Sequence, residues 1–204
     1  MGQYPIFTST TVAMFKTRVN HSTINPTLFL KGMAKSDSFF IRAKVEVGNT
    51  YNESPIDLGA YVDALGKSVL RIHRVSVKYP RVAPSAIANA HTSMVEFQLT
   101  TQRQTVIVDL DDKSLVASGS LQAGYGVPSG TPSLAPPTCF NTDIDTSPDV
   151  FTNGYLVGVE QIYLAGQTAN EDDFGTSRFV EIMMECTVET LSQSGAMALA
   201  LSQQ

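Results

Sequence analysis

The sequence predicts an all-β protein, an antiparallel β-sandwich with the topology of a single jelly roll. Three observations lead there. Short runs of residues alternate between apolar and polar side chains, which is typical of half-buried strands. Long connections rich in Gly, Pro, Ser and Thr separate these runs, and at 204 residues the chain is long enough for one large β domain. A Greek-key sandwich of another strand order fits nearly as well.

We expect three segments along the chain. Residues 1–37 hold scattered apolar islands among Thr, Ser and Asn, and are predicted to form an extended N-terminal arm. Residues 38–191 contain the alternating runs and are predicted to form the sandwich. Residues 192–204 are small and apolar with a helical tendency, so we expect a short C-terminal tail that docks on a neighbouring copy or stays flexible.

The first half of the predicted domain contains three strands and one irregular segment. Residues 39–47 place Ile41, Ala43, Val45 and Val47 on one face. Residues 54–68 fit neither a helix nor a strand and are expected to form a short helix or a wide turn. Residues 69–79 change apolar phase near His73 and Arg74, which predicts a β-bulge there. Residues 94–99 then place Val95, Phe97 and Leu99 inside.

The second half of the predicted domain holds three more strands around a long loop. Residues 105–110 are expected to pair with 94–99 as a hairpin. Residues 117–149 are rich in Gly, Pro and Ser and are expected to form a loop. Residues 154–164 are nearly all apolar, which predicts one central strand. Residues 178–191 alternate most clearly, with five apolar side chains on one face and Glu181, Glu185 and Glu189 on the other.

Basic residues are concentrated in the first half of the chain and acidic residues in the second half. Residues 1–103 hold 12 Lys or Arg against 6 Asp or Glu, whereas residues 104–204 hold 2 against 13, so the net charges are +6 and −11. Charged residues make up only 16% of the chain, below the usual level of ~25%. A sparsely charged exterior suits a protein whose surface is covered by neighbouring subunits, because burying a charge is costly; an ordinary Ser/Thr-rich β protein is an equally acceptable explanation.

A basic set in the first half invites three interpretations. It comprises Arg42, Lys44, Arg71, His73, Arg74, Lys78 and Arg81. The set could pair with the acidic half of a neighbouring copy, face a polyanion, or match adjacent strands of its own sheet. Direct nucleic-acid recognition is disfavoured, because the chain is acidic overall and contains no Trp.

Four patterns that resemble chemical sites are each interpreted as structural. The stretch from Gly59 to Gly66-Lys67-Ser68 has six residues between its glycines instead of the four of a phosphate-binding loop. The acidic loop 141–149 alternates like a calcium loop without its Gly or closing acid, so Ca²⁺ binding there stays open. Strand-end aspartates usually form turns, and isolated histidines lack a nucleophile or metal partner. The residues concerned are Asn141, Asp143, Asp145, Ser147 and Asp149; Asp109, Asp111 and Asp112; and His21, His73 and His91.

The remaining features give no site either. Cys139, in a proline-rich segment, and Cys186, in a predicted strand, are too few for a disulfide scaffold and weakly favour a reducing compartment. No apolar run is long enough to cross a bilayer. We therefore predict no catalytic, cofactor-binding or metal-binding residues, no cofactor, no small-molecule substrate and no enzymatic activity.

The segment from Asp57 to Ile72, DLGAYVDALGKSVLRI, with the alternating strand after it, resembles the early jelly-roll region of capsid proteins from small single-stranded-DNA viruses. The resemblance implies a major capsid protein of the virion that self-assembles into an icosahedral shell. Such proteins usually begin with a basic arm, whereas the first 35 residues here hold only Lys16, Arg18, Lys31 and Lys35. Contact with a genome is therefore expected to be weak or indirect.

An alternative function is a β-sandwich module that binds carbohydrate or protein. A carbohydrate module would need exposed aromatic side chains along a groove, and Tyr51, Tyr61, Tyr125 and Phe140 lie in predicted loops or turns where they could serve.

Overall fold

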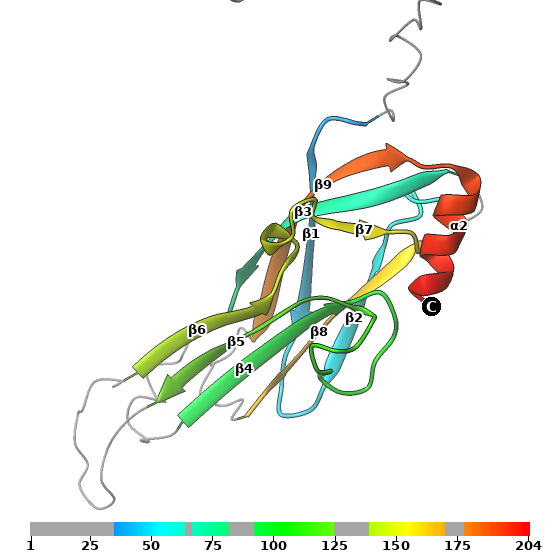
Figure 1. Ribbon diagram of the computed structural model, residues 1–204. Helices are drawn as coiled ribbons and strands as arrows, with labels where there is room; N and C mark the ends of the chain where they lie inside the picture. The colour runs from blue at the N-terminus through cyan, green and yellow to red at the C-terminus, as the bar shows by residue number, and fades with distance from the viewer. Residues whose placement is uncertain (1–34, 64–66, 82–91, 125–138, 170–177) are drawn as a thin grey trace, which may run out of the picture. The chain divides into compact units, whose positions relative to one another are not determined.

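The structure, a computed structural model, describes residues 35–63, 67–81, 92–124, 139–169 and 178–204. All of them belong to one compact unit, Met33–Gln204. Two antiparallel sheets make up this unit (Figure 1). The four-stranded sheet has the order β1-β9-β3-β7, and its strands are Phe39–Glu46, Phe179–Thr190, Ser68–Lys78 and Tyr155–Val157. The five-stranded sheet has the order β2-β8-β4-β5-β6, and its strands are Asn52–Asp57, Gln161–Thr168, Thr92–Thr100, Leu115–Gly124 and Cys139–Thr146.

The order of the strands is that of a jelly roll. Along the chain, β1, β3, β7 and β9 enter one sheet, and β2, β4, β5 and β8 enter the other. Each sheet therefore brings together strands from the beginning and the end of the domain, as two interlocked Greek keys require. β6 is a ninth strand that extends the five-stranded sheet beyond β5. The predicted fold class is confirmed.

The core lies between the two sheets and contains the apolar sets that the sequence predicted. Val95, Phe97 and Leu99 of β4 are at most 1% exposed. On β9, Val180, Ile182, Met184 and Cys186 are buried and Val188 is partly buried. β1 likewise turns Val45 and the following Val47 inward and leaves its charged side chains outside.

The β-bulge predicted in β3 is present. Ile72 lies opposite Cys186 of β9, and Arg74 lies opposite Glu185, so His73 is the extra residue. Because of this insertion, Ile72 and Val75 both face the core. The bulge thus lets one strand change the parity of its sequence while keeping one apolar face.

Two predicted strand assignments are wrong in the first half of the domain. Residues 54–68 were expected to form a short helix or a wide turn; a turn is present at residues 59–61, but Asn52–Asp57 is strand β2. β2 lies at the edge of its sheet and pairs only with β8, which is where Pro55 can be accommodated without losing a ladder hydrogen bond. Residues 105–110 were expected to form a strand, yet they form no strand and leave Val106 59% and Leu110 65% exposed.

Two predictions are also wrong in the second half. The segment 117–149 was expected to be a loop, but it contains most of β5 and all of β6. Small side chains suit β5 because β4 and β6 flank it; a Cβ on Gly119 would lie 2.5 Å from the carbonyl oxygen of Asp143. The apolar run 154–164 is not one strand, since it divides into β7 and the start of β8, which belong to opposite sheets.

The C-terminal segment packs on its own domain. Residues Gln193–Ser202 form helix α2, and the Oγ of Ser192 caps it by accepting a hydrogen bond from the Gly195 N–H. Ala196 and Ala200 are buried. The side chain of Gln203 accepts from the Gly158 N–H (2.8 Å) and donates to the Leu156 carbonyl (2.7 Å), at the point where the chain crosses between the sheets. The tail is therefore packed against its own domain, and its contact with a neighbouring copy stays a prediction. Within the described residues, no helix is long and apolar enough to span a membrane.

Candidate functional site

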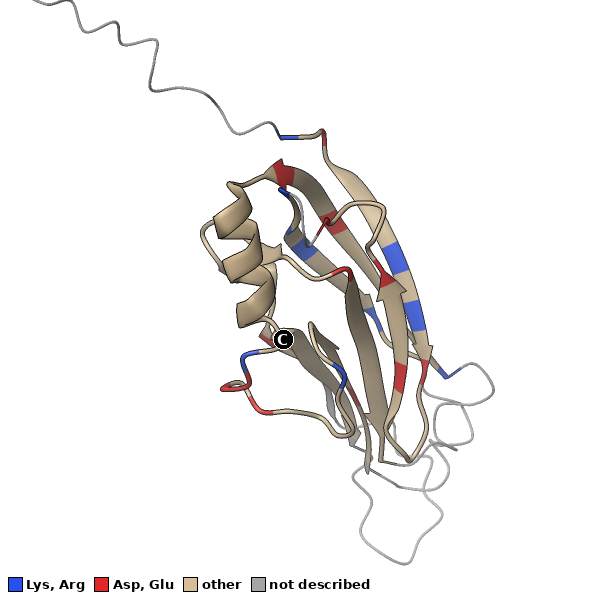
Figure 2. Ribbon diagram, turned by 90° about the vertical axis from the view of Figure 1, so that its right-hand side faces the viewer, with Lys and Arg blue, Asp and Glu red and all other residues tan. Residues whose placement is uncertain are grey.

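The two sheets differ in the charges that their strands carry. The strands of the four-stranded sheet hold five Lys or Arg and four Glu. The strands of the five-stranded sheet contain no Lys, Arg or His, and they hold Glu53, Asp57, Glu96, Asp143 and Asp145. Figure 2 shows the blue bands on the four-stranded sheet beside the red bands of β9. The charge gradient along the sequence thus becomes a difference between two sheets.

Part of the basic set pairs within its own sheet, as one of the three interpretations predicted. Lys44 of β1 and Lys78 of β3 lie on either side of Glu181 on β9. The Nζ of Lys78 is 2.9 Å from Oε2 of Glu181, and both side chains are about half exposed or more (66% and 47%). An ion pair this exposed contributes about 0–1 kcal/mol.

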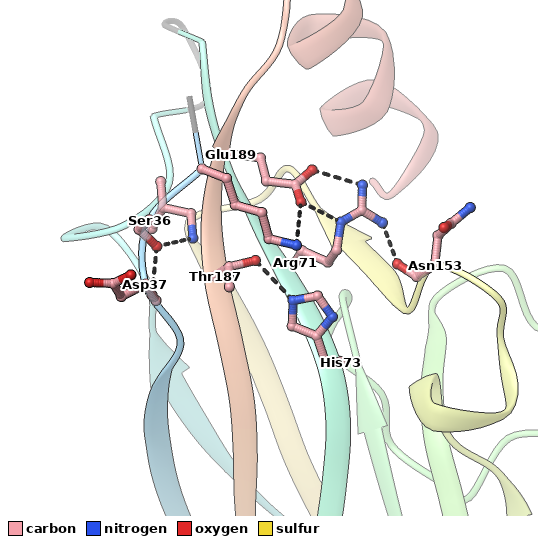
Figure 3. Close-up of polar contacts among 9 residues, drawn as sticks. Ser36, Asp37, Arg71, His73, Asn153, Thr187 and Glu189 are labelled. Atoms are coloured by element: carbon pink, nitrogen blue, oxygen red, sulfur yellow. Dashed lines mark hydrogen bonds and ion pairs between the residues drawn. The ribbon is translucent and has the colours of Figure 1, made fainter. Parts of the chain in front are cut away.

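A second ion pair is more buried and is better placed to hold the sheet together. Nε and Nη2 of Arg71 donate to the two oxygens of Glu189 at 2.7 and 2.8 Å (Figure 3). The two side chains are 15% and 7% exposed. Nη1 of Arg71 also donates to the carbonyl of Asn153, so the guanidinium ties β3 to β9 and to the segment before β7. Two parallel charged hydrogen bonds fix this geometry.

The same carboxylate anchors the end of the predicted arm. The Nζ of Lys35 is 3.5 Å from Oε1 of Glu189, and Ser36 exchanges hydrogen bonds with the backbone of Val188. Hydrogen bonding to Arg71 lowers the pKa of Glu189, and the charges of Arg71 and Lys35 lower it further. Glu189 is therefore the anionic centre of a polar cluster on the outer face of the sheet.

His73 lies in this cluster without the partners of a catalytic base. Its Nε2 is 2.9 Å from Oγ1 of Thr187, which is 3% exposed. Burial lowers the pKa of His73, and the charges of Lys35 and Arg71 add to that effect. The hydrogen bond between the imidazole and Thr187 links β3 to β9.

Two hollows lie on the outer face of the four-stranded sheet. One has a volume of about 540 Å³ and contains the Glu189 cluster together with Arg74, Glu185 and residues of the 149–154 segment. The other, which we call the cationic groove, has a volume of about 610 Å³ and runs along β9 between the side chains of β1 and β3. We define its walls and floor by Arg42, Lys44, Ser76, Lys78, Glu181 and Met183.

The acidic segment 141–149, where the sequence leaves Ca²⁺ binding open, is not one loop. Asn141, Asp143 and Asp145 belong to β6, and Asp149 belongs to the short 3-10 helix η2, Pro148–Val150. A strand separates alternate side chains along its length and does not wrap them around one ion. In the ranges that the structure describes, no group of three His, Cys, Asp or Glu side chains is placed to hold a metal.

The other patterns singled out from the sequence have structural surroundings. Asp112 closes a turn by accepting from the Ser114 N–H (2.8 Å) and hydroxyl (2.6 Å), which lower its pKa; this is the expected turn role. Gly59 to Tyr61 form a turn after β2, whereas residues 64–66 of the P-loop-like stretch lie outside the described residues. His21 and His91 also lie outside them.

Two of the four aromatic residues of the alternative binding module have described side chains, and both contact other residues of the chain. The Tyr51 hydroxyl donates to Glu53 and accepts from Gln98, and burial raises its pKa to about 12. Tyr61 stacks on Phe39 with ring centroids 4.8 Å apart. The side chains of Tyr125 and Phe140 lie outside the described residues. No row of free aromatic rings is formed by the two tyrosines that the structure describes.

Sequence reasoning missed the loop from Thr101 to Ser114, which lies over the outer face of the five-stranded sheet. Gln98 of β4 is 0% exposed although it points outward, because the loop covers it. Its amide donates to the Val106 carbonyl (3.0 Å) and accepts from the Val108 N–H (2.8 Å). The sequence carries no signal for such a cover, because Gln98 stands at an ordinary polar position of the alternating strand.

Comparisons with known proteins give a similarity of fold only. No protein-family model matches the chain, and no curated protein matches it in sequence. A chain of Desmodium yellow mottle tymovirus is similar in structure, with a TM-score of 0.34 and 11% identity over 93% of this chain and 96% of that one. A chain of Cocksfoot mottle virus has a TM-score of 0.35 and 8% identity, over 80% and 99%. VP1 of Trichodysplasia spinulosa-associated polyomavirus has a TM-score of 0.31 and 11% identity, over 76% and 94%.

Proposed function

We propose that this chain is a viral major capsid protein whose copies assemble into a closed icosahedral shell. The observation that carries the proposal is the strand order of a jelly roll, β1-β9-β3-β7 facing β2-β8-β4-β5. This architecture is shared by viral capsid and lectin domains. Fold alone does not fix function, so the proposal also needs a surface suited to self-association.

The described surface has such features. Large apolar side chains are exposed on loops, on η2 and on α2, outside the sandwich core; they are Val106, Leu110, Val150, Phe151, Met197 and Leu201, each at least 44% exposed. Exposed apolar side chains at loops and termini are suited to contacts between subunits. In this proposal the rigid sandwich is the building block, and residues 1–37 and the loops make contacts between copies.

The proposal assigns no chemical step to the protein. Its partners are copies of itself, its location is the virion, and any contact with a genome is weak or indirect. The side chains that converge on the four-stranded sheet support a structural role, because Arg71, His73 and Glu189 hold neighbouring strands together.

Purified full-length protein tests the proposal. We expect negative-stain images to show closed particles of uniform diameter, and analytical ultracentrifugation to show a species far heavier than the 22.0 kDa chain. Protein that stays monomeric at high concentration across a range of salt and pH would overturn it. Glycan-array binding by such a monomer would instead favour the binding-module alternative.

A further inference from the structure

The outer faces of the two sheets carry charges that the described part of the chain neutralises only in part. In the cationic groove, Lys78 pairs with Glu181, and Lys44 lies 4.8 Å above the ring of Phe179. Arg42, which is exposed, makes no ion pair with any described residue. Its guanidinium is therefore available to a carboxylate from outside.

Three carboxylates lie on the outer face of the five-stranded sheet; we call Glu96, Asp143 and Asp145 the acidic ridge. Glu96 of β4 lies opposite Ser120 of β5, which lies opposite Asp143 of β6, so these residues form one row across three strands. Asp143 and Asp145 are exposed, and Asp145 accepts a hydrogen bond from Ser118 at 3.2 Å.

No described Lys or Arg forms an ion pair with a carboxylate of the ridge. The five strands contain no Lys or Arg, and the two cations of the loop 101–114 are engaged elsewhere, Arg103 with Glu53 and Lys113 with the Gln204 carbonyl. Glu96 shows the consequence, because burial and the charge of Asp145 raise its pKa. A cation brought to this face would relieve repulsion among like charges.

We propose that the cationic groove of one copy receives the acidic ridge of a second copy. Charge complementarity argues for this occupant, since Arg42 and its basic neighbours match three carboxylates, and within the described residues neither Arg42 nor these carboxylates form an ion pair. Two grooves or two ridges facing each other would repel, so the contact joins unlike faces and propagates from copy to copy. The inference rests on the proposed assembly function and names the surface and the partner that assembly uses.

Two charge-reversed chains test the contact. In Arg42→Glu/Lys44→Glu the groove becomes acidic like the ridge, and in Glu96→Lys/Asp143→Lys the ridge becomes basic like the groove. We expect each variant alone to give at least about tenfold fewer assembled particles than the wild type, because each now repels its own kind. Mixed in equal amounts, the two variants present matched faces again, and we expect particle yield to recover.

Matched controls separate this contact from a change in net charge. Lys67→Glu/Arg81→Glu and Asp109→Lys/Asp111→Lys alter the net charge by the same amounts at exposed positions outside the groove and ridge. We expect both controls to assemble like the wild type. We also expect wild-type assembly to weaken as the salt concentration rises, since exposed charges are screened.

The outcomes distinguish failure of the contact from failure of the function. Shells that form equally well from wild type and from both reversed variants would overturn the groove–ridge contact and leave the capsid proposal standing. Wild type that gives no particles would overturn the capsid proposal. In that case, a mixture of the reversed variants that stays monomeric in ultracentrifugation would overturn the contact as well, whereas heterodimers would support it. Loss of assembly in each variant without recovery on mixing would also overturn the contact.

Discussion

The two sheets bury similar apolar faces but differ in how their outer faces are stabilised. On the four-stranded sheet, long charged side chains of β1, β3 and β9 meet across the strands, and the Arg71–Glu189 pair links β3 to β9. On the five-stranded sheet, short or uncharged side chains predominate, and the loop 101–114 covers part of the face through Gln98. One sheet thus uses ion pairs between strands, and the other uses a loop held by hydrogen bonds.

The core that the two sheets share is expected to give the largest effect. Phe97→Ala removes the largest of the fully buried side chains from the inner face of β4. We expect it to lower the free energy of unfolding by about 3–5 kcal/mol, because the cavity cannot fully collapse. Val106→Ala, in the loop over the outer face of the same sheet, should cost no more than about 0.5 kcal/mol. Urea denaturation measures both changes. Equal losses would contradict the position of Phe97 in the core between the two sheets.

Substitution of two glutamates of β9 tests whether the more buried ion pair contributes more to the stability of the fold. Glu189→Gln leaves the Arg71 guanidinium without its anion, and we expect a loss of about 2 kcal/mol, less than for a fully buried pair because Arg71 is partly exposed. Glu181→Gln breaks the exposed pair with Lys78 on the same face, and should cost less than about 1 kcal/mol. A reversed ranking in chemical denaturation would contradict the description of the two pairs.

The pH dependence of the Glu189 contribution has a definite sign. Its pKa in the folded protein lies below the ordinary value of 4.5, so the folded state favours the carboxylate. The resulting stability is present above pH about 4.5 and is lost as pH falls through the folded pKa. We therefore expect the difference in stability between wild type and Glu189→Gln to shrink below pH about 4.5. A difference that stays constant through acid pH would argue against ionisation of Glu189 as its cause.

The attachment of α2 gives a smaller effect at the place where the chain crosses between the sheets. Gln203→Leu leaves the Gly158 N–H and the Leu156 carbonyl without their side-chain partner, and we expect a loss of about 1–2 kcal/mol. Gln204→Leu is a matched control, because Gln204 is exposed and contributes only its backbone carbonyl to Lys113. Amide hydrogen exchange should show faster exchange at Gly158 in the first variant alone.

The smallest change concerns a thiol on the inner face of β9. Cys186 is 0% exposed, and burial raises its pKa to about 12. In a Cys139→Ser background, we expect Cys186 to react with a thiol reagent at pH 8 only after unfolding, because the thiolate is the reactive form. Rapid labelling of the native protein would show that β9 opens or that its inner face is wet.

The sequence predicts the four-stranded sheet better than its partner, and the reason is physical. β1, β3 and β9 each have an apolar face toward the core and a polar outer face, so apolar and polar residues alternate along them. The bulge at His73 is also visible in the sequence, because the alternation shifts by one residue there. β5 lacks that signal because small Ala, Ser and Gly residues interrupt its alternation, and β6 lacks it because the residues from Thr142 to Asp145 are all exposed. The division of 154–164 into two strands depends on a crossing between sheets, which no local pattern reports.

The sequence identified the charged residues of the candidate site but not their arrangement in space. The basic set of β1 and β3 and the glutamates of β9 were identified, but their pairing requires the register of β9 between its two neighbours. The Asp112 turn could be predicted because its hydrogen bonds are local. The Glu189 cluster could not, since Lys35, Arg71 and Glu189 are brought together only by the fold.

The extra residue at His73 has a consequence for how β3 can vary. The strand consists of two segments, one before and one after the bulge, and each pairs with β9. Even-numbered residues face the core before the bulge, and odd-numbered residues face it afterwards. Loss of His73 would leave Leu70, Ile72, Val75 and Val77 at alternate positions, so the bulge would close with the same side chains facing the core. Loss of a residue elsewhere in the strand would shift one segment by one position and bring Arg74 or Lys78 toward the interior. The strand can therefore lose a residue at the bulge without exchanging its faces, whereas the spacing of the residues on either side of the bulge is a structural constraint.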